Sequence, residues 1–306
     1  MRAAYYNERG DLEKLQLGDW PKPEPVPGEV LIKTHAAAIG IWDVNVMMGR
    51  FGDPPLPRIP GCEIAGVVEA VSDGSDLEPG DEVYGYLGFE SGGLAEYVTV
   101  ASDHLVRKPE SISFEEAAAL VVGPGTAYEG LVDRAQLRPG ETVLITAASG
   151  GVGTSAVQIA AAAGARVLGV AIARNHDYIR GLGASETFDY NDPDWVSRVR
   201  ESVPKGVDVL FDGAGNETRD HAIAAVKEGG RGVFIVGAPA DPRPDIQAHM
   251  FSMDLTRERL EAINQLVTER KLKAHIEAEL PLEQAREAMA HVSAGHTRGR
   301  VVLKVE

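Results

Sequence analysis

Apolar residues in the first third of the chain occur in short runs that end at turn-forming segments. Proline-rich and glycine-rich stretches such as PKPEPVPG (21–28) separate these runs, and they favour loops because proline fixes φ while glycine permits positive φ. The pattern predicts a β-rich domain of irregular topology. Its expected strands are 3–6, 29–39, 63–71, 81–87 and 95–101.

From about residue 113 the pattern changes to strands that alternate with helices. Ser113 precedes two acidic residues and an apolar run, which is typical of a helix start. Strand–helix alternation predicts a parallel sheet with helices on both faces, whose ligands bind at the carboxyl ends of the strands. The expected strands are 141–146, 166–171, 186–190, 207–215 and 231–239, and the expected helices include 176–184, 192–203 and 217–229.

The last fifty residues return to a mixed pattern. Leu260, Ile263 and Val267 recur at helical spacing within 256–271. A second helix is expected over 282–292, and a closing strand over 299–305.

The most informative local motif is the turn AASGGVG (147–153) between the strand 141–146 and an alanine-rich helical segment. Gly150 and Gly151 would let the backbone approach a pyrophosphate, and Gly153 would let the helix pack closely on the strand. Amides at the helix N-terminus would then bind phosphate oxygens. The alternative is a glycine-rich turn without a ligand.

Composition and charge restrict the possible partners. The 306 residues carry 30 basic and 46 acidic side chains, a net charge of −16, without a run of lysine or arginine. Nucleic acid and anionic membranes are therefore not expected as partners. The single cysteine, Cys62, permits no internal disulfide. Together with the lack of a signal-peptide pattern or an 18-residue apolar run, this predicts a cytoplasmic protein.

Seven motifs together resemble the medium-chain dehydrogenase/reductase superfamily, and within it the zinc-independent, zeta-crystallin-like quinone oxidoreductases. The resemblance implies an α/β fold, in which a GroES-like β-rich catalytic domain (1–117 and 253–306) is interrupted by a doubly wound Rossmann domain (118–252). The motifs are GEVLIK (28–33), IPGCEIAGVV (59–68), EPGDEVYG (78–85), GTAYEGL (125–131), AASGGVG (147–153), LGASETFDY (182–190) and GRVVLKV (299–305).

The resemblance also predicts that no metal is bound. At the places where zinc-dependent relatives carry a cysteine, a His-Glu pair and a second cysteine, this chain has Gly40, Cys62-Glu63 and Val122. One thiolate and a neighbouring carboxylate do not complete a tetrahedral zinc site.

NADPH is the expected cofactor. Ala171 stands where NAD-specific folds carry an acidic residue for the ribose, and Arg174 follows it as a candidate partner for a 2′-phosphate. Tyr190 matches a tyrosine that contacts this phosphate in the quinone reductases; Arg174 as an ordinary surface cation is the alternative. The resemblance assigns further cofactor contacts to Thr126, Ser149, Gly150, Gly151, Val152, Ala214, Val236, Gly237 and Ala238.

For the substrate, Asn45 is the candidate that would hydrogen-bond a carbonyl oxygen and stabilise developing negative charge, and an ordinary turn or surface asparagine is the alternative. Trp42, Met47 and Phe51 would line an apolar pocket, although such residues at this spacing can also be core. The expected activity is hydride transfer from NADPH to a quinone or an α,β-unsaturated carbonyl. The alternatives are a zinc-free alcohol or ketone oxidoreductase and a non-catalytic NADPH-binding protein. A homodimer formed through 244–254 is implied by the resemblance alone.

Overall fold

The computed structural model describes residues 1–52, 54–88 and 92–305. Two compact units divide the chain. The first contains Met1–Val122, Leu255–Thr268 and Lys273–Glu306, and the second contains Gly123–Asp254 and Glu269–Leu272. The predicted division at 117/118 and 252/253 differs from these bounds by a few residues. Among the described residues, no helix combines the length and the apolar character needed to span a membrane.

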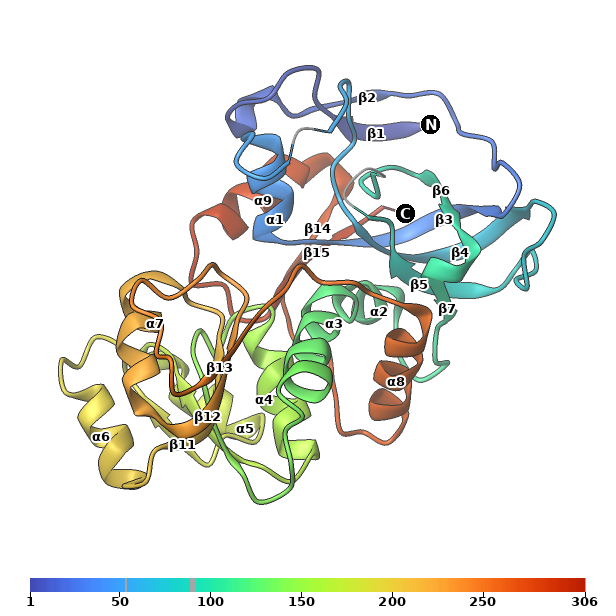
Figure 1. Ribbon diagram of the computed structural model, residues 1–306. Coiled ribbons are helices and arrows are strands. Elements are labelled where there is room, and N and C mark those ends of the chain that lie inside the picture. The colour runs from blue at the N-terminus through green and yellow to red at the C-terminus, as the bar shows by residue number, and fades with distance from the viewer. Residues whose placement is uncertain (53, 89–91, 306) are drawn as a thin grey trace. The chain divides into compact units, whose positions relative to one another are not determined.

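The first unit is built on a seven-stranded sheet with the order β14-β15-β3-β4-β5-β7, in which β6 also pairs with β3 (Figure 1). Its pairs are antiparallel except β14 with β15, so the expectation of a β-rich domain is confirmed. A separate antiparallel pair joins β1 (Arg2–Tyr5) to β2 (Gln16–Asp19). The sheet strands are β3 (Glu29–Ile39), β4 (Glu63–Val71), β5 (Glu82–Tyr86), β6 (Tyr97–Ala101), β7 (Leu105–Arg107), β14 (Ile276–Pro281) and β15 (Arg300–Lys304).

The helices of the first unit are short. They are α1 (Ile41–Met47), α2 (Phe114–Ala119), α8 (Arg257–Thr268) and α9 (Ala285–Ser293). The predicted start of α2 at Ser113 is confirmed: its hydroxyl accepts from the Glu116 amide at 3.2 Å, and the Glu116 carboxylate accepts from the Ser113 amide at 3.0 Å. This reciprocal capping satisfies two amides that the helix geometry leaves unpaired.

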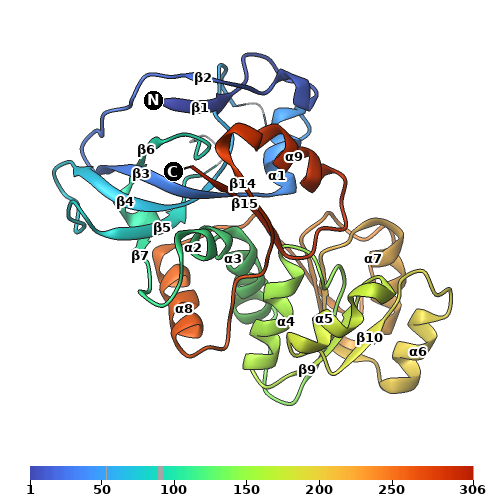
Figure 2. The ribbon, with the colours of Figure 1, turned by 180° about the vertical axis from the view of Figure 1, so that it is seen from behind.

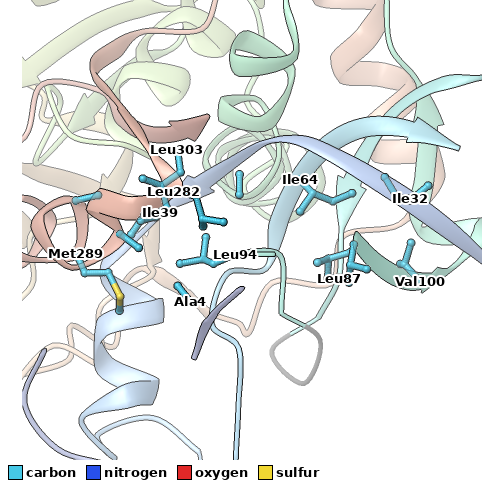
Figure 3. Packing of buried hydrophobic residues seen from close by; sticks show 14 of the residues in the cluster. Ala4, Ile32, Ile39, Ile64, Leu87, Leu94, Val100, Leu282, Met289 and Leu303 are labelled. Carbon is cyan, nitrogen blue, oxygen red and sulfur yellow. The ribbon is translucent and has the colours of Figure 1, made fainter. Parts of the chain in front are cut away.

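The hydrophobic core of this unit joins segments far apart in the sequence. Ile39 of β3, Leu303 of β15 and Met289 of α9 belong to one buried cluster, with Ala4 of β1 in the same cluster (Figure 3). Because the last strand and the last helix are part of this core, the chain must return to the first unit to complete it. Removing apolar surface of this kind from water stabilises the fold by roughly 25 cal/mol per Å².

The second unit contains a six-stranded sheet with the order β10-β9-β8-β11-β12-β13, all of whose pairs are parallel. The predicted parallel sheet is therefore confirmed. Its strands are β8 (Thr142–Ile145), β9 (Arg166–Val170), β10 (Glu186–Phe188), β11 (Val207–Asp212), β12 (Val226–Phe234) and β13 (Gln247–Met250).

Helices connect these strands and cover the sheet. Trp195 and Val199 of α6 are buried in one cluster with Leu144, Leu168 and Leu210 of the sheet. The helix α4 packs on β8 and β9, and α5 packs on β10, in the region seen from behind in Figure 2. The helices are α3 (Val122–Tyr128), α4 (Gly153–Ala162), α5 (His176–Gly181), α6 (Trp195–Ser202) and α7 (Asn216–Ala222).

Several elements differ from the sequence-based expectation. The strands β2, β7 and β14 were not expected, and β12 begins and ends five residues before the expected strand 231–239. The helix predicted over 217–229 is too long, because α7 ends at Ala222, a 3₁₀ turn covers Ile223–Ala225, and β12 begins at Val226. The apolar residues 222–226 fit either a buried helix face or a buried strand, and periodicity alone does not separate the two. The helix α1 was also not expected, because the sequence around residues 42–51 indicates only a wall of the substrate pocket.

Candidate functional site

The order in which the chain adds strands to the parallel sheet reverses between β8 and β11. The chain continues from β8 to β9 and β10 on one side, and β11, β12 and β13 lie on the other side. In sheets of this kind the loops at the carboxyl ends of the strands beside this point form the ligand site. Here those loops are 146–152 after β8 and 213–215 after β11. The site is built from these loops and from the loops that follow β9, β10 and β12.

The glycine turn has the geometry of a phosphate cradle. A Cβ at Gly153 would lie 2.1 Å from the carbonyl oxygen of Ala147, so only glycine lets α4 approach the end of β8 this closely. Among the described residues, the amides of Gly151 and Val152 donate to no recorded acceptor. Unpaired amides at the start of the ten-residue helix α4 are the groups that bind an anion. Gly150 differs, because its amide donates to Ala147 at 2.9 Å.

Asn175 was not identified from the sequence. Its buried side-chain amide donates to the Ser149 hydroxyl at 3.0 Å, which joins the glycine turn to the loop after β9. An asparagine between two other polar residues carries no local signal of this role. The contact shows that Ser149, a predicted cofactor ligand, has its hydroxyl positioned by a neighbouring loop.

Ala147 has a left-handed backbone conformation, with φ +49°. This conformation places Cβ close to the following carbonyl and costs an L-residue about 1–2 kcal/mol. Ala147 occupies the first glycine position of the motif, and the structure shows that the backbone there still has the conformation that glycine favours.

We therefore expect Ala147→Gly to stabilise the protein by up to about 1 kcal/mol, because relief of the strain exceeds the added entropy of the unfolded chain. Ala148→Gly is the matched control: Ala148 is fully buried and has no positive φ, so it should destabilise. Urea unfolding of both variants measures the difference. Equal destabilisation by both changes would show that the conformation at Ala147 carries no cost.

A buried hydrogen-bond network links the ends of β8 and β11. The Thr146 hydroxyl donates to Asp212 Oδ1 at 2.6 Å and accepts from the Gly213 amide at 3.1 Å, while Asp212 Oδ2 accepts from the Gly215 amide at 3.0 Å. Burial raises the pKa of Asp212, and these hydrogen bonds oppose that shift. The network fixes the loop of Ala214, a predicted cofactor contact. The sequence feature that could have indicated this network is the charged residue Asp212 at the end of the apolar run VDVLFD (207–212).

The loop after β9 carries the residues predicted to select the cofactor. Ala171 is buried directly after β9, and Arg174 is exposed on the next turn, with no ion pair among the described residues. Asp189, after β10, accepts from the Ala173 amide at 3.2 Å and thereby holds the turn that carries Arg174. Tyr190 is half-buried next to Asp189, at the same edge of the sheet. Arg174 is thus a guanidinium that remains available to an anion.

The loop after β12 is held by a buried arginine. Arg219 of α7 donates to the carbonyls of Val236 and Gly237 at 3.4 and 3.3 Å, and Gly237 has a φ of +82°. Val236, Gly237 and Ala238 are all exposed, and 48 % of Val236 is accessible. A large apolar side chain left exposed at the ligand edge of the sheet suits contact with a planar ligand. Thr126, on α3, is buried.

In the first unit, Asp43 is held by backbone amides. Its carboxylate accepts from the amide of Gly40 at 2.8 Å and from the amide of Gly61 at 3.2 Å. Burial raises the pKa of Asp43 to about 6, against the lowering effect of these bonds and of Arg300. These contacts tie the start of α1 to the segment before β4, so Asp43 has a structural role here.

Glu63 and Arg300 form a buried ion pair, in which Arg300 Nη2 donates to Glu63 Oε1. Glu63 Oε2 also accepts from the Val122 amide at 2.8 Å, and burial raises the pKa of Glu63 to about 7. The Arg300 guanidinium lies 5.0 Å from the centre of the Trp42 ring. Glu63 and Arg300 can each be read from the sequence, but the sequence does not show that the two residues pair.

Cys62 is buried beside this pair. Burial raises the pKa of its thiol well above the usual range, and the carboxylates of Asp43 and Glu63 raise it further. A thiol in this environment is a poor metal ligand, because metal binding requires the thiolate. The described residues contain no group of three or more His, Cys, Asp and Glu side chains arranged to hold a metal ion.

The residues predicted to contact substrate separate into two groups. Asn45 is half-buried on α1, and 48 % of Phe51 is exposed, so both are accessible. Met47 was expected in the pocket wall; this is wrong, because it is fully buried in the core cluster that also contains Met289 of α9. At helical spacing Met47 lies on the face of α1 that packs inward, whereas Asn45 does not.

Trp42 is folded back over Gly40. A Cβ built on Gly40 would lie 2.1 Å from two carbons of the indole ring. The indole ring therefore fills the space next to the position where relatives are expected to carry an asparagine or a zinc-ligating cysteine. This arrangement could not be inferred from the sequence, since it depends on the rotamer of Trp42.

Comparisons with known proteins agree with this architecture. Residues 26–110 match the model of the alcohol dehydrogenase GroES-like domain, and residues 182–303 match that of the zinc-binding dehydrogenase family. The mouse quinone oxidoreductase is 33 % identical over 98 % of this chain and 96 % of its own length. The NADPH-dependent alkenal/one oxidoreductase of Arabidopsis thaliana, a chloroplastic protein, is 32 % identical over 99 % of this chain and 79 % of its own length. A solved structure described as an NAD-dependent alcohol dehydrogenase matches all of both chains with a TM-score of 0.92 and 34 % identity.

A GroES-like β-rich unit joined to a parallel dinucleotide-binding sheet, with relatives of this kind over nearly the whole chain, defines an oxidoreductase. The chain belongs to the medium-chain dehydrogenase/reductase superfamily, as a member of its quinone oxidoreductase-like group.

Proposed function

We propose that this oxidoreductase uses NADPH to reduce a quinone or an α,β-unsaturated carbonyl and that it does so without a metal. The observation that carries the cofactor assignment is the exposed, unpaired Arg174 beside the buried Ala171 at the end of β9. An acidic residue in place of Ala171 would bind ribose hydroxyls and repel a 2′-phosphate, whereas a free guanidinium attracts the phosphate.

The second unit fits the cofactor along one edge of its sheet. The unpaired amides of Gly151 and Val152 would hold the pyrophosphate, with the Ser149 hydroxyl alongside. Arg174 and Tyr190 would hold the 2′-phosphate, and the loops fixed by Asp212 and Arg219 would contact the remaining groups. NADPH supplies a hydride when it is bound. The predicted contacts on those two loops are Ala214, Val236, Gly237 and Ala238, and Thr126 of α3 is a further predicted contact.

The residues of the first unit do not fit a catalytic zinc. Cys62 is the single thiol of the chain and is buried with a raised pKa, and the carboxylate of Glu63 is already paired with Arg300. In the zinc-dependent relatives, oxidation of an alcohol relies on the metal as a Lewis acid to stabilise the alkoxide. A quinone or an enone accepts hydride into its own π-system. Because Cys62 and Glu63 do not fit a catalytic zinc, they support such conjugated compounds as the substrates.

The names of the relatives support the same substrate classes. The mouse relative is a quinone oxidoreductase and the Arabidopsis relative acts on alkenals and alkenones, according to their names. The structural neighbour named as an NAD-dependent alcohol dehydrogenase favours a second candidate, a metal-free alcohol or ketone oxidoreductase. The absence of an acid at Ala171 opposes the NAD part of that alternative.

The test is consumption of NADPH and NADH by the purified protein with a panel of small quinones, enones, ketones and alcohols, accompanied by zinc analysis. We expect turnover of a quinone or an enone with NADPH, zinc well below one per chain, and no loss of activity with a chelator. Stoichiometric zinc and sensitivity to chelation would contradict the proposal. Cofactor binding without turnover of any substrate would favour a non-catalytic protein.

Asn45→Ala is expected to lower kcat/KM for an enone by about tenfold, because an amide that stabilises charge in the transition state contributes at least this much. The comparison is Asn7→Ala, an exposed asparagine of the same unit with no recorded side-chain contact. Steady-state kinetics on enones and quinones gives the result. Unchanged kinetics with both substrates would remove Asn45 from the mechanism.

The proposal includes a homodimer formed through 244–254 and a reducing, cytoplasmic location. β13 lies at the edge of the parallel sheet, and 56 % of Met250 at its end is exposed, so this strand can extend the sheet to a second copy. The buried free thiol of Cys62 supports the reducing compartment.

A further inference from the structure

A cavity of about 510 Å³ lies in the second unit at the edge of the sheet opposite the cofactor loops. Its wall includes the start of β12 and the segment between α6 and β11. Four of its lining residues are basic and one is acidic, in a chain whose net charge is −16. The basic residues are Arg200, Lys205, Lys227 and Arg243, and the acidic residue is Glu228.

Two of these cations are not neutralised by a carboxylate. Arg200 donates from Nε to the carbonyl of Ala224 at 3.1 Å, a neutral partner that fixes the guanidinium but leaves its charge uncompensated. Lys205 is exposed and has no ion pair among the described residues. The other two are paired, Lys227 with Asp208 and Arg243 with Asp245. The cavity therefore keeps an excess of positive charge.

Helix dipoles explain only part of this arrangement. Arg200 is in the last turn of α6, where a cation stabilises the unpaired carbonyls of the helix end. Lys205 lies three residues beyond the end of α6 and has no recorded contact with these carbonyls. Capping of α6 accounts for Arg200 and leaves Lys205 without a partner.

We propose that this cavity binds a small phosphorylated anion, either an inorganic phosphate or the phosphate of a nucleotide. Its volume lies in the range of small-molecule sites, about 300–1,000 Å³. A guanidinium held by a hydrogen bond and an exposed ammonium are groups that recognise phosphate, the first through paired hydrogen bonds and the second as a point charge. An anion would also compensate the charges of Arg200 and Lys205, the two cations that no carboxylate pairs with among the described residues.

This site is independent of the cofactor edge. Gly206 of the cavity wall immediately precedes β11, which ends at Asp212 in the cofactor network, and six residues of a strand span about 20 Å. A ligand in the cavity therefore does not compete directly with the dinucleotide.

The experiment is calorimetric titration of the full protein with inorganic pyrophosphate without added dinucleotide, and the part of the binding that is lost in Lys205→Glu is assigned to the cavity. Lys205→Glu is expected to weaken pyrophosphate binding by about tenfold or more, because it replaces a favourable charge with a repulsive one. Lys205 is exposed and unpaired, so the variant should fold, and a circular dichroism melting curve verifies this. A second titration, with adenosine monophosphate, distinguishes the two sources. If adenosine monophosphate binds more tightly than pyrophosphate and this binding depends on Lys205, the ligand is a nucleotide. If it binds more weakly than pyrophosphate, the ligand is an inorganic anion.

Arg138→Glu is the matched control, since Arg138 is an exposed, unpaired cation just before β8 at the same edge of the sheet and outside the cavity wall. Its effect on binding should be less than about twofold, because exposed charges at a distance are screened by salt. Equal weakening by both variants, or no pyrophosphate binding at millimolar concentration, overturns the proposal. Activity assays with NADPH are independent of this result, so failure of the anion site leaves the proposed reductase function intact.

Discussion

Arg174→Ala should lower kcat/KM for NADPH by roughly 10–100-fold while changing kcat/KM for NADH by less than about twofold. Arg174 is exposed and has no ion pair among the described residues, so its guanidinium loses no internal contact on substitution. A charge-assisted hydrogen bond contributes about 1.5–3 kcal/mol, and each 1.4 kcal/mol corresponds to about tenfold in affinity. Because NADH lacks the 2′-phosphate, the effect should be confined to NADPH. Initial-rate kinetics with both cofactors measures it.

Arg180→Ala is the matched control for this prediction. Arg180 is an exposed arginine on α5, in the same part of the unit, and is paired with Asp177 at 3.0 Å. Its loss changes the net charge by the same amount without removing the proposed phosphate ligand. If both variants lose the same efficiency with NADPH, or if Arg174→Ala affects NADH equally, Arg174 does not select the cofactor.

Arg300→Met is expected to destabilise the protein by about 3–5 kcal/mol at pH 8 and by clearly less at pH 6. Removing one member of a buried ion pair leaves the other charge buried without compensation. The pKa of Glu63 is raised by burial to about 7 although Arg300 lowers it, so it rises further in the variant. A carboxyl group with a raised folded-state pKa binds protons that the unfolded chain releases, and stability then falls as the pH rises toward that pKa. In the variant this fall continues above pH 7.

Urea unfolding of Arg300→Met at pH 6 and pH 8 measures this dependence. The double variant Glu63→Gln/Arg300→Met is the control, because a neutral amide at position 63 removes the titrating group. The double variant should lose the additional pH dependence while keeping part of the destabilisation. A loss of stability in Arg300→Met that is the same at pH 6 and pH 8 would show that Glu63 is not its origin.

The sequence predicts best those features that local pattern determines. β3 and β4 coincide with the expected strands 29–39 and 63–71, because runs that contain β-branched residues and are bounded by turn segments favour a strand. The glycine turn is also local: strand, turn and helix follow one another within twenty residues, so its position in the fold follows from the motif.

Features that depend on distant partners could not be predicted in this way. Thr146 and Asp212 are 66 residues apart, and Glu63 and Arg300 are 237 residues apart. Each of these residues is unremarkable in its own neighbourhood, and only the strand order brings the pairs together. Met47 was misassigned for a related reason, since the helix α1 that directs its side chain into the core was not anticipated.

The position of Trp42 over Gly40 couples the residues that these two positions can carry. Any side chain introduced at position 40 would overlap the indole ring, since even its Cβ would lie 2.1 Å from the ring carbons. The asparagine or cysteine that related enzymes are expected to carry there therefore requires the indole ring to move. Movement of the ring, or a smaller residue at position 42, costs the contact with the Arg300 guanidinium. The two positions are thus expected to be epistatic: a side chain at position 40 should be tolerated better when position 42 carries a smaller residue.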